Sequence, residues 1–381
     1  MLEKLRSIFG GKGRASADPR ELGEPREPSS EGRRAKTGSS VSRPPHSETW
    51  ETARATLLPV LRGATYGVEM WAKQRSAAFA RRPFLPYIDH AVVIDEPTSM
   101  HYVSRHAIER WGVTEEAVFA AAEERLSLLA APSVEPHDDD AHGPLWIVTS
   151  NDTYESSRLL VRGWLASFRG RVEGNPVAII PERSTLIVGG DARPEMIELL
   201  LDKAEEEFTA SKRRLSPALY SVDAQGAVVP YARRSTDPLA AKVKVAHEKL
   251  AIYEHRAQKE VLDALHEERE EDVFVGRYLV FEGADAPLPR SLSVWTKGVR
   301  SYLPRTEKVI LLVPGEGPGA KPKASVEVPF EAIRDRLTPV PEHRPERFET
   351  TGEFPTDGEL RSFTERPSGG ARVPRPQPRG A

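Results

Sequence analysis

The sequence predicts an α+β protein in which helices pack against antiparallel strands. Two segments, 92–129 and 177–212, follow the same plan of strand, short turn, strand and helix. Turns this short favour antiparallel pairing, because a parallel connection needs a crossover of about a dozen residues or more. We therefore expect an antiparallel sheet built from these two units, followed by a long helix and a small β-rich lobe, with disordered tails.

Residues 1–46 have the composition of a disordered N-terminal tail. They are rich in Gly, Ser, Pro, Arg and Glu and hold few large apolar side chains. Such a segment cannot bury enough surface to offset the entropy of ordering. The first nine residues place apolar side chains at helical spacing, which fits either a small membrane or partner anchor or a frayed helical stub.

An α+β core is expected over residues 47–233. Its first part, 51–73, has the apolar spacing of one or two helices, and a strand hairpin with two helices follows over 91–129. Residues 132–144 have the composition of a loop. A helix with a capping box is expected next, before the second hairpin and its helix at 177–212.

The remaining chain divides into three predicted parts. Residues 234–271 form a long amphipathic helix, which fits equally a coiled-coil arm for dimerisation and a helix packed along the core. Residues 272–337 form the β-rich lobe, and 338–381 form a Pro-rich disordered tail. The last stretch, 373–379, favours polyproline II and could be a docking motif or a plain tether.

Four stretches of the core carry a resemblance to a known family. They are Ala91–Val103, Trp111–Glu116, Pro176–Leu186 and Leu215–Tyr220. Together they resemble the YtpQ-like bacterial family, domain of unknown function 1444, over residues 82–231. The resemblance implies a bacterial, cytoplasmic protein with one continuous fold in that region, and it implies no activity.

Composition excludes several kinds of chemistry. The 381 residues contain no cysteine, so disulfides, thiol nucleophiles, Cys-ligated zinc and iron–sulfur clusters are excluded. The net charge of −3 gives no overall bias towards nucleic acid. Apolar runs such as 309–313 fall far short of the ~20 residues that span a bilayer, so we expect a cytoplasmic protein without a membrane span.

The densest polar cluster could hold a divalent metal. Its candidate ligands are His137, Asp138, Asp139, Asp140 and His142, since carboxylates and imidazoles are common metal ligands. The run lacks the spacing of an EF-hand, so a solvated acidic loop is the alternative.

Turn carboxylates are the candidate catalytic groups. Asp95 and Glu96 lie in the first hairpin, and Asp191 precedes a helix after the second. If the two hairpins are neighbours in the sheet, these groups could form an acid/base pair or a metal site. Ordinary turn chemistry is the alternative, because Asp and Glu beside Pro are common in turns.

A basic run and a pair of helix histidines are two further candidate sites, and each also has an ordinary structural explanation. The basic run 212–214, with Tyr220 and Tyr231 following, could bind single-stranded nucleic acid, or could simply end a helix. His247 and His255 are eight residues apart, about 12 Å along a helix and too far to share one zinc. We expect both to be exposed on the long helix.

These observations favour a non-catalytic protein-interaction or scaffold module. Its expected partner is another protein, or a second copy bound through the long helix or the tails. A metal-dependent or acid/base hydrolase using the turn carboxylates and a weak nucleic-acid binder are the alternatives. We expect no cofactor, because no phosphate loop or nucleophile elbow is present.

Overall fold

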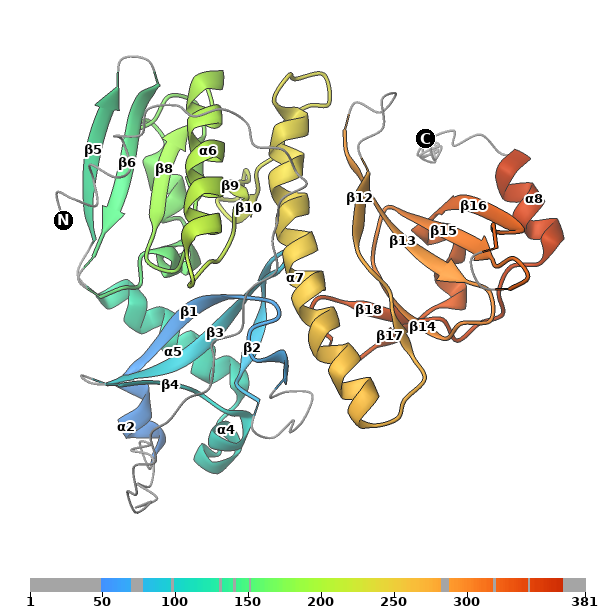
Figure 1. Ribbon diagram of the computed structural model, residues 1–381. Helices are drawn as coiled ribbons and strands as arrows, with labels where there is room; N and C mark the ends of the chain where they lie inside the picture. The colour runs from blue at the N-terminus through green and yellow to red at the C-terminus, as the bar shows by residue number, and fades with distance from the viewer. Residues whose placement is uncertain are drawn as a thin grey trace, which may run out of the picture. The chain divides into compact units, whose positions relative to one another are not determined.

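Figure 1 shows the computed structural model, which describes residues 49–365. Within that range the undescribed residues are 70–77, 97–98, 130–131, 140–141, 151, 282–287, 318–319 and 342. The predicted N-terminal tail and the last part of the C-terminal tail lie outside the described residues.

The first sheet is antiparallel and packs against α5. Its strand order is β1-β3-β2, and β4 pairs with the other end of β3. The elements are α2 (Trp50–Arg54), β1 (Leu57–Gly63), β2 (Arg81–Leu85), β3 (Ile88–Glu96), β4 (Ser99–Tyr102), α4 (Arg105–Trp111) and α5 (Glu115–Leu128). The predicted hairpin and its two helices are confirmed. The helical prediction for 51–73 is wrong over 57–63, because the continuous buried run from Leu57 forms β1, and residues 70–73 lie outside the described part.

The second sheet is also antiparallel and holds six strands in the order β10-β9-β7-β8-β6-β5. The elements are β5 (Ser133–Asp139), β6 (Gly143–Thr149), η2 (Ser156–Leu160), η3 (Leu165–Phe168), β7 (Pro176–Ile179), β8 (Leu186–Gly190), α6 (Pro194–Ala210), β9 (Leu219–Val222) and β10 (Val228–Pro230). The second unit, β7-β8-α6, is confirmed. The loop predicted for 132–144 is wrong, since most of it forms β5 and its turn into β6.

The two units lie in separate sheets. β3 and β4 belong to the first sheet, whereas β7 and β8 belong to the second. The predicted α+β class is therefore confirmed. The prediction that both hairpins belong to one sheet is wrong. Side chains of both sheets share one apolar cluster that includes Leu61, Ile88, Ala178 and Tyr220.

The long helix is α7 (Ala240–Glu268), close to its predicted bounds. Four residues of its predicted apolar stripe, Leu239, Val243, Ala246 and Leu250, are buried in the clusters formed with the two sheets, while Tyr253 is 38% exposed and Ala257 is partly buried. The interpretation as a helix packed along the core is therefore correct. A coiled coil through this stripe would have to draw those side chains out of the core.

The β-rich part contains two mixed sheets, of order β11-β14-β18-β17 and β12-β13-β15-β16. β11 pairs parallel with β14 and β13 pairs parallel with β15. The elements are β11 (Phe274–Val275), β12 (Leu279–Phe281), β13 (Arg290–Thr296), β14 (Ser301–Pro304), β15 (Lys308–Val313), β16 (Ala324–Pro329), η4 (Phe330–Arg336), β17 (Thr338–Val340), β18 (Arg347–Glu349) and α8 (Asp357–Glu365).

The prediction of disorder is wrong for the described residues after 338. This segment supplies β17, β18 and α8, and its Phe348 and Leu360 are buried in the core of the β-rich part. The many prolines of this segment led to the prediction of disorder. Pro is nevertheless compatible with a short strand such as β17. Among the described residues, no helix combines the length and apolar character needed to cross a membrane.

Candidate functional site

A pocket of about 400 Å³ opens where the β2–β3 turn, α7 and the segment before β18 come together. Pockets of this volume are of the size that holds small molecules. The lining residues are Ala64, Pro83, Phe84, Leu85, Pro86, Tyr87, His255, Arg305, Arg344, Pro345 and Glu346. One wall is therefore mostly apolar, and the polar groups come from α7 and the later part of the chain.

A tight turn places Tyr87 over α7. Leu85 pairs with Ile88, so Pro86 and Tyr87 are the two central residues of the β2–β3 hairpin. Tyr87 has φ 64°, a left-handed backbone conformation that residues other than Gly seldom adopt. Its ring packs edge-on against the imidazole of His255 with centroids 5.5 Å apart. Backbone strain of this kind concentrates at functional sites.

His255 is a buried imidazole with an unmet polar atom. Only 3% of the residue is exposed, and its ring stacks on Tyr278 with centroids 4.8 Å apart. Its Nδ1 atom has no hydrogen-bond partner among the described residues. Burial lowers the pKa of His255 well below its usual value, so the ring is neutral. The expectation that this histidine is exposed is wrong.

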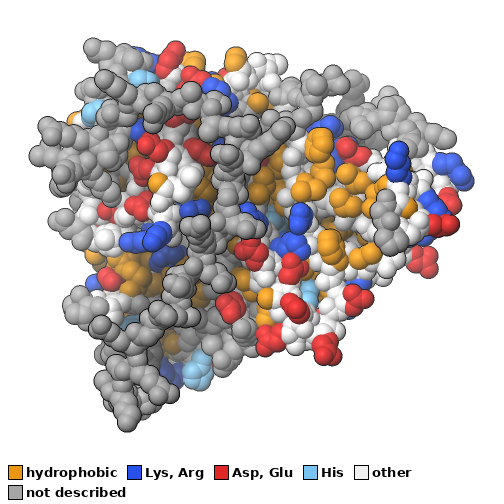
Figure 2. Space-filling model, viewed as in Figure 1, with side chains coloured by type: hydrophobic (Ala, Val, Ile, Leu, Met, Phe, Trp, Pro, Cys, Tyr) orange, Lys and Arg blue, Asp and Glu red, His pale blue; other side chains and the backbone are white. Residues whose placement is uncertain are grey.

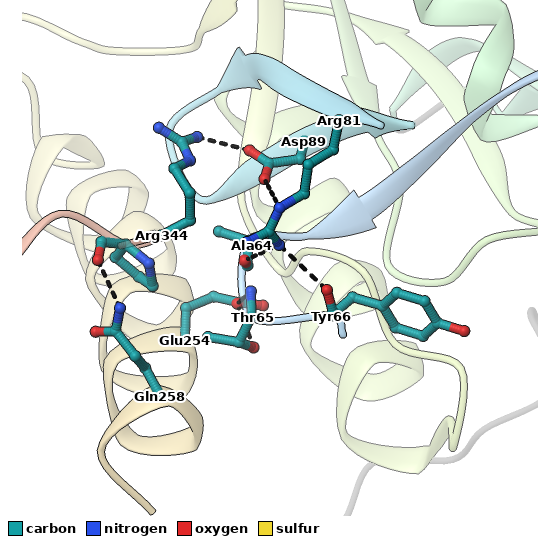
Figure 3. A network of polar contacts seen from close by, with 9 residues as sticks. Ala64, Thr65, Tyr66, Arg81, Asp89, Glu254, Gln258 and Arg344 are labelled. Atoms are coloured by element: carbon teal, nitrogen blue, oxygen red, sulfur yellow. Dashed lines mark hydrogen bonds and ion pairs between the residues drawn. The ribbon is translucent and has the colours of Figure 1, made fainter. Parts of the chain in front are cut away.

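Asp89 joins two arginines beneath the pocket (Figure 3). Arg344 donates to Asp89 Oδ1 at 2.6 Å, and Arg81 Nε lies 3.7 Å from Oδ2. Arg81 also donates to the carbonyl oxygens of Ala64 and Tyr66. Asp89 is 1% exposed, and burial raises its pKa while Arg344 and Arg81 lower it. The Nε atom of Arg344 has no partner among the described residues.

Glu254 of α7 is held by the end of β1. Its Oε2 accepts hydrogen bonds from both the backbone N–H and the hydroxyl of Thr65, each at 2.7 Å. Burial raises the pKa of Glu254 to about 7 in spite of these bonds. A Cβ atom on Gly63 would lie 2.2 Å from Glu254 Oε1, so this close approach requires glycine.

Arg347 is a buried cation with neutral partners. It is 1% exposed and donates to Gln258 Oε1 and to the carbonyl oxygens of His255, Gly276 and Tyr302. Burial lowers its pKa to about 9. Burial raises the pKa of Asp89, the one carboxylate that the described structure pairs with Arg81 and Arg344, and the bonds of Arg347 go to neutral groups, so these arginines outnumber their paired carboxylates.

The predicted catalytic carboxylates have separate local roles. Glu96 accepts from Ser99 at the end of β3, and Asp95 pairs across the hairpin with Met100. Asp191 follows β8 and accepts from the backbone N–H of Asn175 at 2.7 Å. Because β3 and β8 lie in separate sheets, the condition of neighbouring hairpins is not met. Their use in catalysis remains a prediction.

The predicted metal ligands lie on the β5–β6 hairpin. His137 is on β5 and His142 is at the turn, while Asp140 and the side chains of Asp138 and Asp139 lie outside the described part. In the part that is described, no group of three or more His, Asp or Glu could hold a metal ion. This metal site also remains a prediction.

The basic–aromatic cluster has the geometry of a helix end. Arg214 donates to the carbonyl oxygens of Ser211 and Thr209 just after α6. Tyr220 and Tyr231 are buried, so neither ring is presented for stacking on a base.

Sequence reasoning missed the residues that build the pocket. One usable signal was that Glu254 and Gln258 continue the buried i, i+4 series of Ala246 and Leu250 on α7. Arg344 and Arg347 carried no such signal, because the surrounding prolines placed them in a predicted disordered tail.

Comparison with known proteins gives a partial match. The chain is 30% identical over 92 residues to the UPF0354 protein lin1649 of Listeria innocua, which covers 24% of this chain and 34% of that protein. The chain thus matches about a third of the length of this curated relative. No protein-family model matches the chain, and no solved structure matches it.

Proposed function

We propose that this chain is a non-catalytic binding module that holds a small organic ligand in the pocket at α7. The supporting observation is the lining of a pocket of about 400 Å³, in which an apolar wall faces the charged side chains of Arg305, Arg344 and Glu346. A mostly apolar hollow with a few convergent polar groups is the usual form of a small-molecule site.

Binding has more support than catalysis at this pocket. Among the described residues, the lining includes no Ser, Thr or Lys that could act as a nucleophile, and the imidazole of His255 stacks on Tyr278 with Tyr87 edge-on against it. Asp89 is hydrogen-bonded to Arg344 and forms an ion pair with Arg81. The hydrolase and nucleic-acid alternatives rest on residues outside this pocket and have less support.

A ligand screen on the full chain tests the proposal. Compounds that raise the melting temperature should lose that effect in His255→Phe, which keeps the aromatic stack and removes both ring nitrogens. His106→Phe on α4 is the matched control, because that histidine is exposed. The proposal fails if no compound stabilises the protein, or if every stabilising compound binds His255→Phe equally well.

A protein-interaction function has a separate observation in its favour. β12 is an edge strand, and its Leu279 and Phe281 are 38% and 62% exposed. They share one face with the partly exposed Val294 and Ile310 on β13 and β15, and hydrophobic side chains gather over this sheet in Figure 2. A partner would pair an extended segment with the backbone of β12 and cover the exposed face with apolar side chains from another part of that partner.

Pull-downs from native bacterial lysate with the full chain test this second function. A partner should be captured by the wild type and lost in Phe281→Lys. Leu128→Lys is the matched control, since Leu128 is an exposed side chain on α5. Capture that is unchanged in Phe281→Lys would contradict docking at β12.

The chain's family and location are part of the same proposal. The match to a UPF0354 protein and the motif stretches around β3 and β7 support membership of the YtpQ-like bacterial family and a cytoplasmic location. A solved structure of the Listeria protein tests the membership. Membership predicts that it contains the β3–β4–α4–α5 arrangement or the β7–β8–α6 arrangement.

A further inference from the structure

We infer that the ligand of the α7 pocket is an organic anion, a carboxylate attached to an apolar body. This inference rests on the proposed binding function and names the chemical class of its ligand. It is argued from the charge beneath the pocket, the donors in its lining and the character of its wall.

The charge beneath the pocket is the first argument. Three guanidinium groups, those of Arg81, Arg344 and Arg347, lie in or beside a network in which Asp89 is the one carboxylate that the described structure pairs with them. Glu254 compensates only in part, because its pKa is about 7. The charge of Asp263 raises the pKa of Arg347 from a distance. Asp263 forms its own ion pair with Lys259, so it does not add a free negative charge. Buried cations without a counter-ion are costly, so a bound anion would relieve the imbalance.

The donors in the lining are the second argument. Arg344 lines the pocket and donates to Asp89 through one terminal nitrogen, so its guanidinium lies at the pocket surface with its unpaired Nε enclosed behind it. Arg305 lies at the pocket as well and is exposed, with Glu331 as its ion-pair partner. Arginine donors match the two oxygens of a carboxylate in geometry and charge.

The wall supplies the third argument. Pro83, Phe84, Leu85 and Pro86 line the pocket from the β2–β3 hairpin, and Pro345 lines it from the other segment. An inorganic anion such as phosphate would leave this surface uncovered, whereas an apolar body would bury it at about 25 cal/mol per Å². The lining also contains one carboxylate, Glu346, which repels an anion. Because Glu346 is exposed, solvent screens this repulsion.

The test uses pairs of compounds that differ only in charge. Binding of 2-naphthoate and octanoate to the full chain is compared by calorimetry at pH 7.5 with binding of 2-naphthamide and octanamide. We expect each carboxylate to bind at least about tenfold more tightly than its amide, equivalent to about 1.4 kcal/mol. Inorganic phosphate and sulfate should not compete at equal concentration.

Substitutions of two exposed lining residues test the effect of charge on binding without changing a buried side chain. Glu346→Gln removes the opposing charge and should tighten carboxylate binding about two- to threefold while leaving the amides unchanged. Arg305→Gln should weaken carboxylate binding by a similar factor. Glu316→Gln is the control, because Glu316 is highly exposed and bonds only Lys323 in the described structure.

The outcomes separate the ligand class from the pocket itself. Amides that bind as tightly as the carboxylates, and compete with them, would overturn the anion and leave the binding pocket standing. Competition by phosphate as strong as that of octanoate would overturn the apolar body. If no carboxylate binds, this inference fails whatever neutral compounds do, and the proposed function fails only if the wider screen is negative too.

Discussion

Glu254 shows at the residue scale how burial sets protonation. Burial raises its pKa from 4.5 to about 7, so between these values the folded chain keeps a proton that the unfolded chain has released. The free energy of unfolding therefore falls as the pH rises through this window. The difference between the two pKa values corresponds to about 3 kcal/mol.

We predict that Glu254→Gln reduces this pH dependence. The amide oxygen can still accept both hydrogen bonds from Thr65, but the side chain no longer ionises. Urea unfolding of both proteins at pH 5, 6, 7 and 8 measures the difference. The variant should gain stability relative to the wild type as the pH rises, and a constant difference would contradict the assignment. Asp89 and His255 remain in both proteins, so their titration cancels.

Gly63 is the second test at the residue scale. Gly63→Ala would place a Cβ atom 2.2 Å from Glu254 Oε1, so the buried carboxyl of Glu254 must move and disturb its bonds to Thr65. We predict a loss of about 1–3 kcal/mol in the free energy of unfolding, as for overpacked sites in general. Gly358→Ala on α8 is the control, because its nearest contact is at 4.0 Å, and it should be neutral or stabilising. Equal effects of the two substitutions would refute the close approach.

Arg347 connects two elements, α7 and β18, that are about 90 residues apart in the sequence. Its bonds to Gln258 and His255, and the bond from Gln258 Nε2 to the carbonyl of Pro345, fix this segment along the helix. The same segment carries Arg344 and Glu346 into the pocket. The pocket therefore depends on how β18 and α7 are joined.

At this scale we predict that Arg347→Ala lowers the free energy of unfolding by about 3–5 kcal/mol, because buried acceptors lose their donor. Arg300→Ala should cost less than about 1 kcal/mol, since Arg300 forms an exposed ion pair with Glu349. Chemical denaturation of both variants provides the comparison. A loss for Arg347→Ala as small as that for Arg300→Ala would show that the buried bonds contribute little.

For the whole molecule, the end of the folded region is the feature that sequence reasoning misjudged. A chain ending at Leu337, the boundary predicted from composition, lacks β17, β18, α8 and the pocket residues Arg344, Pro345 and Glu346. We predict that this truncation unfolds at a much lower temperature or fails to fold. A chain ending at Glu365 keeps all of the described contacts and should melt within a few degrees of the full chain. Circular dichroism melting curves decide between these expectations, and a stable chain ending at Leu337 would contradict them.

The sequence by itself determined the α+β class, the two strand–turn–strand–helix units and the bounds of α7. These features depend on local hydrophobic periodicity, turn residues and helix caps, such as the capping bonds of Ser104 and Thr114. The tertiary structure alone decided that the units lie in separate sheets and that β5, β17 and β18 form. Strand pairing depends on long-range contacts that local patterns do not encode.

The same reason explains the pocket. Asp89, Glu254, His255, Arg344 and Arg347 come from three distant segments, and each is an ordinary polar residue in its local sequence. Only folding brings them together, removes them from water and leaves their charges unbalanced, and these properties depend on surroundings rather than on spacing along the chain.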